Sequence, residues 1–155
     1  MKRICFLLAV VILGMLQVTL LDHFRIFGIK PDLLLIALVM ASIDFGPGWA
    51  LGISMSAGMC KDIFSAGPFG INTILFPLWG LVIVKLSKKI SIDSILIFSA
   101  AVLAVSVLNS IVTRFLFLYS GKFIPLGIFL RILFLESAYT GLVSALFFRL
   151  RRFYQ

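Results

Sequence analysis

The sequence predicts an all-α integral membrane protein with six transmembrane helices and with both termini in the cytoplasm. Composition is the first reason: 62% of the 155 residues are hydrophobic, 13% are charged, and the mean hydropathy is +1.19. A soluble domain of this size leaves a large share of its surface in water and could not hide that many apolar side chains. The second reason is the placement of the positive charges, which lie in clusters between long apolar runs.

The positive charges set the number of membrane crossings. Eight of the fourteen Lys and Arg residues form three clusters, which are Lys2 and Arg3, then Lys85, Lys88 and Lys89, then Arg149, Arg151 and Arg152. Cationic residues that flank a transmembrane helix preferentially stay on the cytoplasmic side. If all three clusters are cytoplasmic, the chain crosses the membrane an even number of times between each pair of clusters.

Apolar segments account for these crossings. A transmembrane helix needs about 20 apolar residues, because each residue rises about 1.5 Å through about 30 Å of hydrocarbon. The predicted helices are Ile4–Leu21, Leu33–Ile43, Pro47–Cys60, Gly70–Val84, Ile95–Leu118 and Ile124–Phe148. The first has the basic start of a signal peptide, but no small-x-small cleavage site follows Gly14, so we expect it to remain as a span.

The short second and third helices decide between two topologies. Treating Leu33–Cys60 as one broken span gives five crossings and leaves six positive charges outside. Treating it as two helices gives six crossings with all clusters inside, and the sequence DFGPG at residues 44–48 is typical of a turn followed by Pro at a first helical position. If these two short helices enter the membrane and return without crossing it, the number of crossings between the basic clusters is still even. We therefore predict six helices in a single polytopic membrane domain, residues 1–155, with short loops.

Glu136, near the middle of the last span, is the most unusual residue inside the predicted membrane region. A charged group there costs about 2.5–3.5 kcal/mol on insertion scales and therefore needs a partner. Arg131 lies about 140° away around the helix and does not pair naturally with Glu136, whereas Arg114 of the fifth span is a possible partner across helices. Two interpretations stay open: a buried ion pair or ligand-responsive carboxylate, and a protonated or hydrogen-bonded Glu136 that locks two helices together.

Small and hydroxylated residues form stripes on three helices. They are Gly48, Gly52 and Ser56 on the third, then Ser99, Ser106, Asn109, Ser110 and Thr113 on the fifth, then Ser137, Thr140, Gly141 and Ser144 on the last. Such residues let helix backbones approach each other and hydrogen-bond across the interface. We expect all three stripes to be internal packing surfaces, and a partner-binding face is the alternative.

Two acidic residues are expected at the outer ends of the second and third helices. Asp32 follows Pro31 in a first helical turn, where a negative charge suits the helix dipole, and Asp62 ends the third helix. Because these two helices form a hairpin, the two carboxylates are expected to be near neighbours. They serve either as caps and turn residues or as recognition groups for a partner at the outer face.

The sequence offers no enzyme chemistry and predicts no cofactor. A catalytic site needs a nucleophile, a base and a positioning group within reach of each other, but Ser54 and Ser56 lack a histidine because His23 is expected near the outer surface. Cys5 and Cys60 are expected on opposite sides of the membrane, and no Cys/His spacing suits a metal. The net charge of +8 lies mostly at membrane edges, so we expect contact with anionic lipid rather than nucleic acid.

Two segments carry a resemblance to a known family. They are KPDLLL at residues 30–35 and GMCKDIFSAGPFG at residues 58–70. With Gln17 late in the first span, their order resembles the bacterial rod shape-determining protein MreD family, which has Pro-Asp at the start of the second span (Pro31 and Asp32 here). The family's third helix ends in Asp (Asp62) and is followed by a Gly-Pro-x-Gly turn that ends here at Gly70. Lys61 stands where that family usually has an apolar residue.

The resemblance implies a non-enzymatic scaffold or regulator of the cell-elongation (rod) complex in the bacterial inner membrane. It implies association with an MreC-like protein and with a SEDS glycosyltransferase and a class B penicillin-binding protein, in support of peptidoglycan synthesis. It also implies a fold similar to the substrate-binding components of ECF vitamin transporters. The alternative function is therefore a vitamin-type binding component, in which Glu136 with Arg131 or Arg114 holds a polar ligand. Against that alternative, the first span lacks the small-x-x-x-small coupling motif that those transporter components use, because Ala9 is followed at i+4 by Leu13.

Overall fold

The structure is a computed structural model that describes residues 2–19, 31–64, 69–90, 92, 94–119, 121 and 125–154. In these ranges the regular secondary structure is entirely helical. The six helices are α1 (Lys2–Thr19), α2 (Leu33–Asp44), α3 (Gly46–Phe64), α4 (Ile71–Ser87), α5 (Ile95–Tyr119) and α6 (Leu126–Tyr154). The predicted number and order of helices are confirmed.

The helix boundaries differ from the prediction mainly at two C-terminal ends. α3 continues to Phe64 instead of ending at Cys60, and α6 continues to Tyr154 instead of ending at Phe148. Each predicted helix ends where its apolar run ends. Both extensions contain basic residues, which are favourable near a helix C-terminus because the last carbonyl groups carry partial negative charge.

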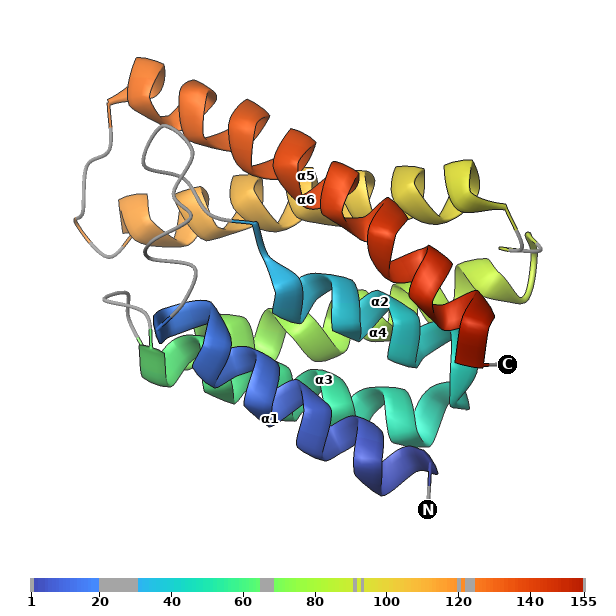
Figure 1. Cartoon of the computed structure of the whole chain (residues 1–155). Helices are drawn as coiled ribbons and strands as arrows, with labels where there is room; N and C mark the ends of the chain where they lie inside the picture. Colours follow the sequence, from blue (N-terminus) through green and yellow to red (C-terminus); the bar gives the residue numbers. More distant parts are fainter. Residues whose placement is uncertain are drawn as a thin grey trace.

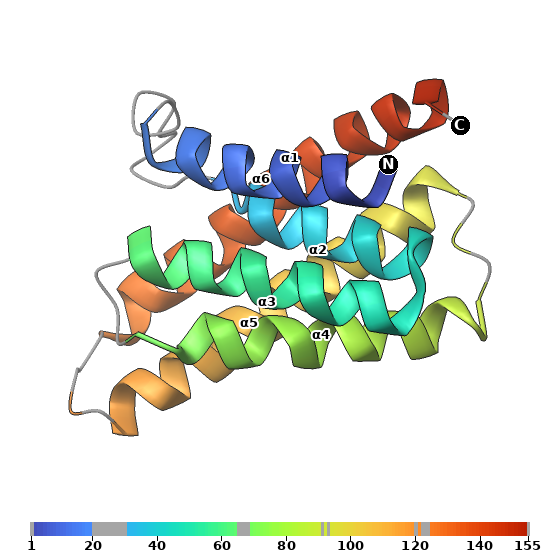
Figure 2. The same ribbon diagram turned by 90° about the horizontal axis from the view of Figure 1, so that it is seen from below.

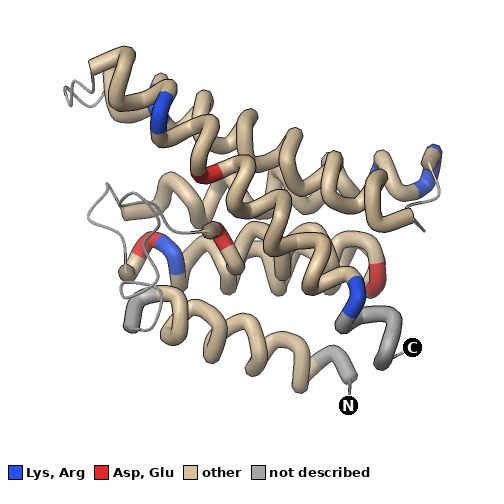
Figure 3. The backbone as a smooth tube through the Cα atoms, turned by 45° about the horizontal axis from the view of Figure 1, so that its top comes forward, with Lys and Arg blue, Asp and Glu red and all other residues tan. Residues whose placement is uncertain are grey.

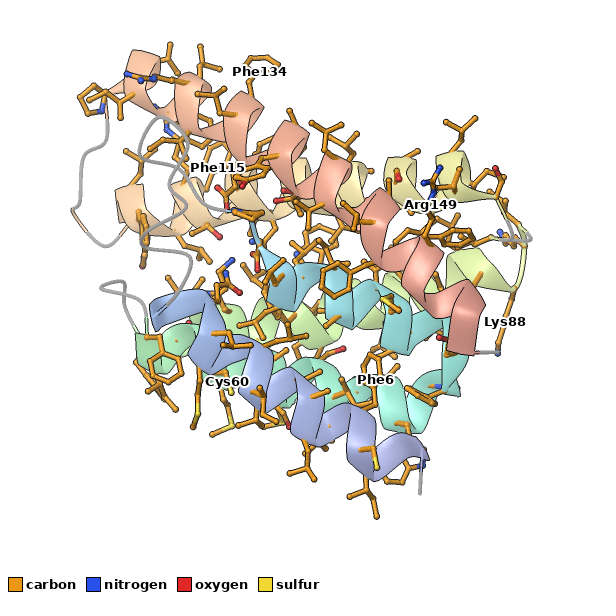
Figure 4. All side chains as sticks on the ribbon, in the orientation of Figure 1. Phe6, Cys60, Lys88, Phe115, Phe134 and Arg149 are labelled. Carbon is orange, nitrogen blue, oxygen red and sulfur yellow. The ribbon has the colours of Figure 1, made fainter. Side chains whose placement is uncertain are left out.

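The helices run back and forth, so the chain has two distinct ends (Figures 1 and 2). Both chain termini and the α2–α3 turn lie at one end, which we call the terminal end, and Lys88 and Arg149 lie toward it (Figure 4). The opposite end, which we call the distal end, holds the last turns of α1, α3 and α5 and the first turns of α2, α4 and α6. The three basic clusters therefore belong to helix ends on the same side of the molecule.

α2 is the centre of the fold because it contacts all five other helices. Its buried residues include Leu34, Leu35, Ile36 and Leu38. α1 packs on α2 and α3, and α3 packs closely on α4. α5 and α6 pack on each other as a hairpin, and in the described part of the chain their backbones come close to α2 and α4 among the remaining helices. The molecule is thus a four-helix group with a helical hairpin against one side.

Glycines allow α3 and α4 to approach each other closely. A Cβ atom added to Gly58 would lie 2.7 Å from the carbonyl carbon of Asn72 and 2.8 Å from Thr73 Cα. A Cβ atom added to Gly80 would lie 2.6 Å from Ser54 Oγ. All three distances are shorter than real Cβ contacts, so a side chain at position 58 would push against the backbone of α4, and one at position 80 would displace the Ser54 hydroxyl.

The expectation that Gly48, Gly52 and Ser56 form an internal packing surface is wrong. Gly48 and Gly52 are exposed, and a Cβ atom added to either would meet nothing within 4 Å. The packing face of α3 instead contains Ala50, Ile53, Ser54, Ala57 and Gly58. Ser54 lies two residues from Gly52, about 200° around the helix, so the buried face is nearly opposite the one predicted.

The stripes on α5 and α6 do pack inside the molecule. Ser137, Thr140, Gly141 and Ser144 are all buried, and so are Ser106 and Asn109. Ser144 Oγ donates to Ser99 Oγ at 3.3 Å, and Asn109 Oδ1 accepts from Trp79 Nε1 at 3.2 Å. The predicted packing surface of α6 is therefore confirmed, whereas on α5 Ser106 and Asn109 pack inside and Ser99, Ser110 and Thr113 are half-buried.

Among the described residues, two helices are long and apolar enough to cross a membrane, which are α5 over Ile95–Tyr119 and α6 over Leu126–Arg149. Only 28% and 22% of their most apolar windows are buried, whereas the core helix of a soluble protein is mostly buried. Large apolar side chains such as Leu142 (74% exposed) cover their outer surfaces. Ile4–Gln17, Leu33–Asp44 and Ile71–Ser87 are shorter apolar helices. This surface is consistent with a membrane protein.

Candidate functional site

Polar side chains from five helices gather toward the distal end, where α2 and α4 begin and α3 ends. We call this group the distal polar cluster, and its members are Gln17, Asp32, Lys61, Asp62, Asn72, Thr73, Glu136 and Thr140. Most charged segments of the described chain lie toward the two ends of the molecule, and segments of both signs occur toward the distal end (Figure 3). The cluster therefore joins helices that are far apart in the sequence.

Asp32 is the buried centre of the cluster. Its side chain caps α2 by accepting a hydrogen bond from Leu35 N at 3.1 Å, and its backbone nitrogen donates to Thr140 Oγ1 of α6 at 3.1 Å. Its carboxylate also forms an ion pair with Lys61 of α3. The Lys61 ammonium lies 5.2 Å from the centre of the Phe76 ring of α4. Asp32 is thus the capping residue that the sequence predicted, and it also links α2 to α3 and α6.

Asp62 lies in the last turn of α3 but caps the first turn of α4. Its carboxylate accepts from the backbone nitrogens of Gly70 (3.0 Å), Asn72 (3.1 Å) and Thr73 (2.8 Å), and also from Asn72 Nδ2 and Thr73 Oγ1. A helix leaves its first N–H groups without partners in the helix, and a carboxylate there also suits the helix dipole. Gly70 precedes α4 with φ +102°, a conformation that favours glycine, and it has no side chain to cap α4 itself.

Gln17 connects α1 to the start of α2. Its Oε1 accepts a hydrogen bond from Leu34 N at 3.3 Å, and its side chain is buried. The first turn of α2 therefore receives acceptors from Asp32 and from another helix. Pro31, also buried, immediately precedes this arrangement.

Glu136 has a different electrostatic partner from those predicted. It is half-buried and interacts electrostatically with Lys61 and Asp32. Neither Arg114 nor Arg131 is among the groups that act on it in the described part of the chain. The Arg114 guanidinium lies 4.2 Å from the centre of the Phe129 ring, and Arg131 is exposed. Lys61 replaces the expected arginines as the cation that acts on Glu136 because α3 ends close to the start of α2, where Lys61 pairs with Asp32.

The cluster includes residues that the sequence analysis did not select. Asn72 and Thr73 directly follow Gly70 at the start of an apolar helix, and this position is typical of capping residues. In the sequence, Lys61 stands out only as a departure from the family pattern. Gly52 was selected, but it lies outside the cluster on an exposed face of α3.

Chemically, the cluster is suited to holding helices together. Asp32 and Asp62 cap helices, Gln17 and Thr140 accept from the start of α2, and Lys61 neutralises Asp32. Within the described ranges, no group of three or more His, Cys, Asp or Glu residues could hold a metal ion. Glu136 is the one member whose carboxylate has no hydrogen bond among the described residues.

The fold and the cluster define an all-helical protein of membrane type, in which polar side chains connect helix ends. The model of the family described as rod shape-determining protein MreD matches residues 2–154. The chain therefore belongs to the MreD family, a membrane-associated family with a role in rod-shape determination. Searches of curated proteins and of solved structures each returned no match.

Proposed function

We propose that this MreD family member is a non-enzymatic scaffold of the cell-elongation complex in the bacterial inner membrane. It supports peptidoglycan synthesis through association with an MreC-like protein and with a SEDS glycosyltransferase and class B penicillin-binding protein pair. The family role in rod-shape determination supports this proposal. The main structural support is that Asp32 and Asp62, the acidic residues at the distal helix ends, are engaged in joining helices.

The proposed topology has six membrane crossings, a single domain over residues 1–155 and both termini in the cytoplasm. Its support is the common placement of the three basic clusters at helix ends on the terminal side, as the positive-inside rule requires. The shorter apolar helices belong to the same packed group, in which α2 is at the centre, α4 packs on α3, and α1 packs on α2 and α3. Lateral contact through helix surfaces is then the main way in which this protein acts.

A small-molecule binding component is the second candidate. The observation that favours it is the half-buried Glu136 carboxylate, which lacks a hydrogen bond in the described chain and could accept one from a polar ligand. The arginines that were expected to complete such a site, Arg114 and Arg131, are not among the groups that act on Glu136. The similarity to ECF substrate-binding components stays a prediction. We therefore favour the scaffold.

Co-purification tests the proposed scaffold function. Tagged protein is isolated from gently solubilised membranes, and its partners are compared with those of an unrelated six-span protein at equal expression. We expect enrichment of the MreC-like protein and of the two synthesis enzymes. Equal recovery with the unrelated protein would contradict the scaffold function. Saturable binding of a vitamin by the purified protein would instead favour the second candidate.

A further inference from the structure

One side of α4 is an exposed apolar stripe. Ile74, Leu78 and Val82 follow one another at intervals of four residues, and each is between 50% and 66% exposed. Residues spaced by four lie on one side of a helix, and the buried residues of α4, such as Phe76 and Ile83, lie on the other side. In a membrane protein this stripe is in contact with lipid.

Three lysines at the terminal end of α4 lie on the same side as this stripe. Lys85, Lys88 and Lys89 are all exposed, and an i to i−4 backbone hydrogen bond of 2.9 Å continues the helical rotation as far as Ile90. At 3.6 residues per turn, Lys85 and Lys89 project within about 20° of Leu78. The positive-inside rule explains why these lysines lie at this end of the helix, but it does not require them to share one side. We call the three apolar residues and the three lysines the α4 outer face.

Acidic residues do not balance the charge of these lysines. By sequence position, the segments that meet at the terminal end contain eight Lys and Arg residues and two acidic residues, Asp44 and Asp93. This comparison covers every residue of those segments, including the ones outside the described ranges. Asp93 follows α4 in the sequence and carries one negative charge against the three positive charges of the lysines. The lysines form no ion pair with a described residue, so the α4 outer face has an excess of positive charge wherever Asp93 lies.

We propose that the α4 outer face binds an anionic phospholipid, whose headgroup phosphate lies between the lysines and whose acyl chain lies along the apolar stripe. From Ile74 to Lys85 the helix rises about 16 Å, which is close to half of a hydrocarbon core about 30 Å thick. The apolar stripe therefore matches the acyl chain of one leaflet, whereas an acidic segment of a soluble protein would leave that stripe uncovered. Basic residues at the cytoplasmic surface attract anionic headgroups. This inference goes beyond the proposed scaffold function and does not depend on it.

Photocrosslinking to lipid tests this proposal. A photoreactive residue replaces Val82, on the α4 outer face, or Leu96, which is 77% exposed near the same end of α5, a helix without a cation before Arg114. The full chain is reconstituted in vesicles of phosphatidylcholine with a minor fraction of phosphatidylglycerol, and the crosslinked lipids are identified by mass spectrometry. We expect phosphatidylglycerol to be enriched at position 82 by about fivefold or more, which is what one lysine near an anionic headgroup can provide, and not to be enriched at position 96. Equal enrichment at the two positions would overturn the proposal.

Substitution of the lysines tests their role in the same assay. With Lys85→Gln, Lys88→Gln and Lys89→Gln combined, the lipids crosslinked from position 82 should return to the composition of the vesicle. Arg131→Gln removes one exposed cation from the first turns of α6 at the distal end, and this control should leave the enrichment unchanged. Full enrichment in the triple variant would contradict the proposal. If the triple variant does not fold, the comparison of positions 82 and 96 in the otherwise unchanged protein still decides the outcome.

Two soluble competitors distinguish a lipid from other anions. Glycerol phosphate has the headgroup charge without an acyl chain, and at the concentration of the phosphatidylglycerol it should not reduce the enrichment at position 82. Loss of the enrichment would show that free phosphate is sufficient and would contradict a lipid site. Displacement of the lipid by poly-glutamate at the same charge concentration would identify an acidic protein segment as the preferred occupant, and the proposal would be wrong. None of these measurements uses a wall-synthesis protein, so their failure is distinguishable from failure of the scaffold function.

Discussion

The Asp62 carboxylate, in the last turn of α3, accepts a hydrogen bond of 3.1 Å from the backbone nitrogen of Asn72, in the first turn of α4. The same carboxylate accepts from Gly70 and Thr73. One side chain thus takes up N–H groups that α4 cannot satisfy within itself. The connection between the two most closely packed helices is therefore held by a cap that belongs to one helix and serves the other.

Loss of this cap is predicted to destabilise the protein. Asp62→Ala should lower the free energy of unfolding by roughly 2–4 kcal/mol, because it removes a helix cap and leaves buried donors without an acceptor. Asp62→Asn should cost less, since one oxygen remains to accept. Thermal unfolding in detergent measures the effect. Ile63→Ala, at an exposed neighbouring position, is the control and should change stability much less. Equal effects at positions 62 and 63 would contradict the role of the cap.

Two glycines of α3 are predicted to respond oppositely to the same substitution. Gly58→Ala should destabilise the protein by about 1–3 kcal/mol, because its Cβ atom would meet the backbone of α4. Gly52→Ala should be neutral or stabilising by up to about 1 kcal/mol, because nothing lies within 4 Å of its Cβ atom and alanine favours a helix. Unfolding of the two variants under the same conditions provides the comparison. The packing face assigned to α3 would be wrong if Gly52→Ala were the more damaging change.

The ion pair between Lys61 and Asp32 is predicted to be necessary for stability mainly because Asp32 is buried. Lys61→Met should cost about 3 kcal/mol, since it leaves an uncompensated carboxylate that is 3% exposed. Adding Asp32→Asn should recover part of this loss, because the amide oxygen can still accept from Leu35 N without a charge. A double-mutant cycle should give a coupling of about 1 kcal/mol or more. Lys85→Met, at an exposed site on α4, is the control; additive effects of the two cluster changes would show that the residues act independently.

The proposed topology predicts which positions face the exterior of the cell. In a background with Cys5→Ser and Cys60→Ser, the Tyr119→Cys variant should react with a membrane-impermeant maleimide added to whole cells. Tyr119 is 94% exposed at the distal end of α5. The Lys88→Cys variant should react only after the membrane is opened, because Lys88 lies toward the terminal end. Labelling of Lys88→Cys in intact cells would overturn the six-crossing layout.

The helices could be predicted from hydropathy and turn residues, but the packing face of α3 could not. In a soluble protein the buried face of a helix differs from the exposed face in polarity. In an apolar helix that distinction is lost, because lipid and protein interior are similarly apolar. Glycine spacing therefore favoured the face with Gly48 and Gly52, whereas the close contact with Asn72 and Thr73 occurs at Gly58.

The partners of the charged residues depended on distances between helices that sequence spacing does not contain. Arg114 and Arg131 are the obvious cations near Glu136 in the sequence, but in the described structure Lys61 of α3 is the cation that acts on it. Asp32 and Asp62 were expected near each other, and both interact electrostatically with Lys61. The cap that Asp62 provides to α4 could have been suspected from Asn72 and Thr73, which are typical residues at a helix start.

The number of helices, their order and the charge at their ends follow from local features of the chain, because apolar run lengths and turn residues act along each segment. The sequence is also sufficient for the family, because the family model matches residues 2–154. The buried face of α3, the cation that acts on Glu136 and the helix that Asp62 caps depend instead on how the helices pack together. These features arise where separate helices meet. A close approach at a glycine, or an ion pair between helices, depends on how two backbones are placed relative to each other, and no single segment of the sequence specifies that placement.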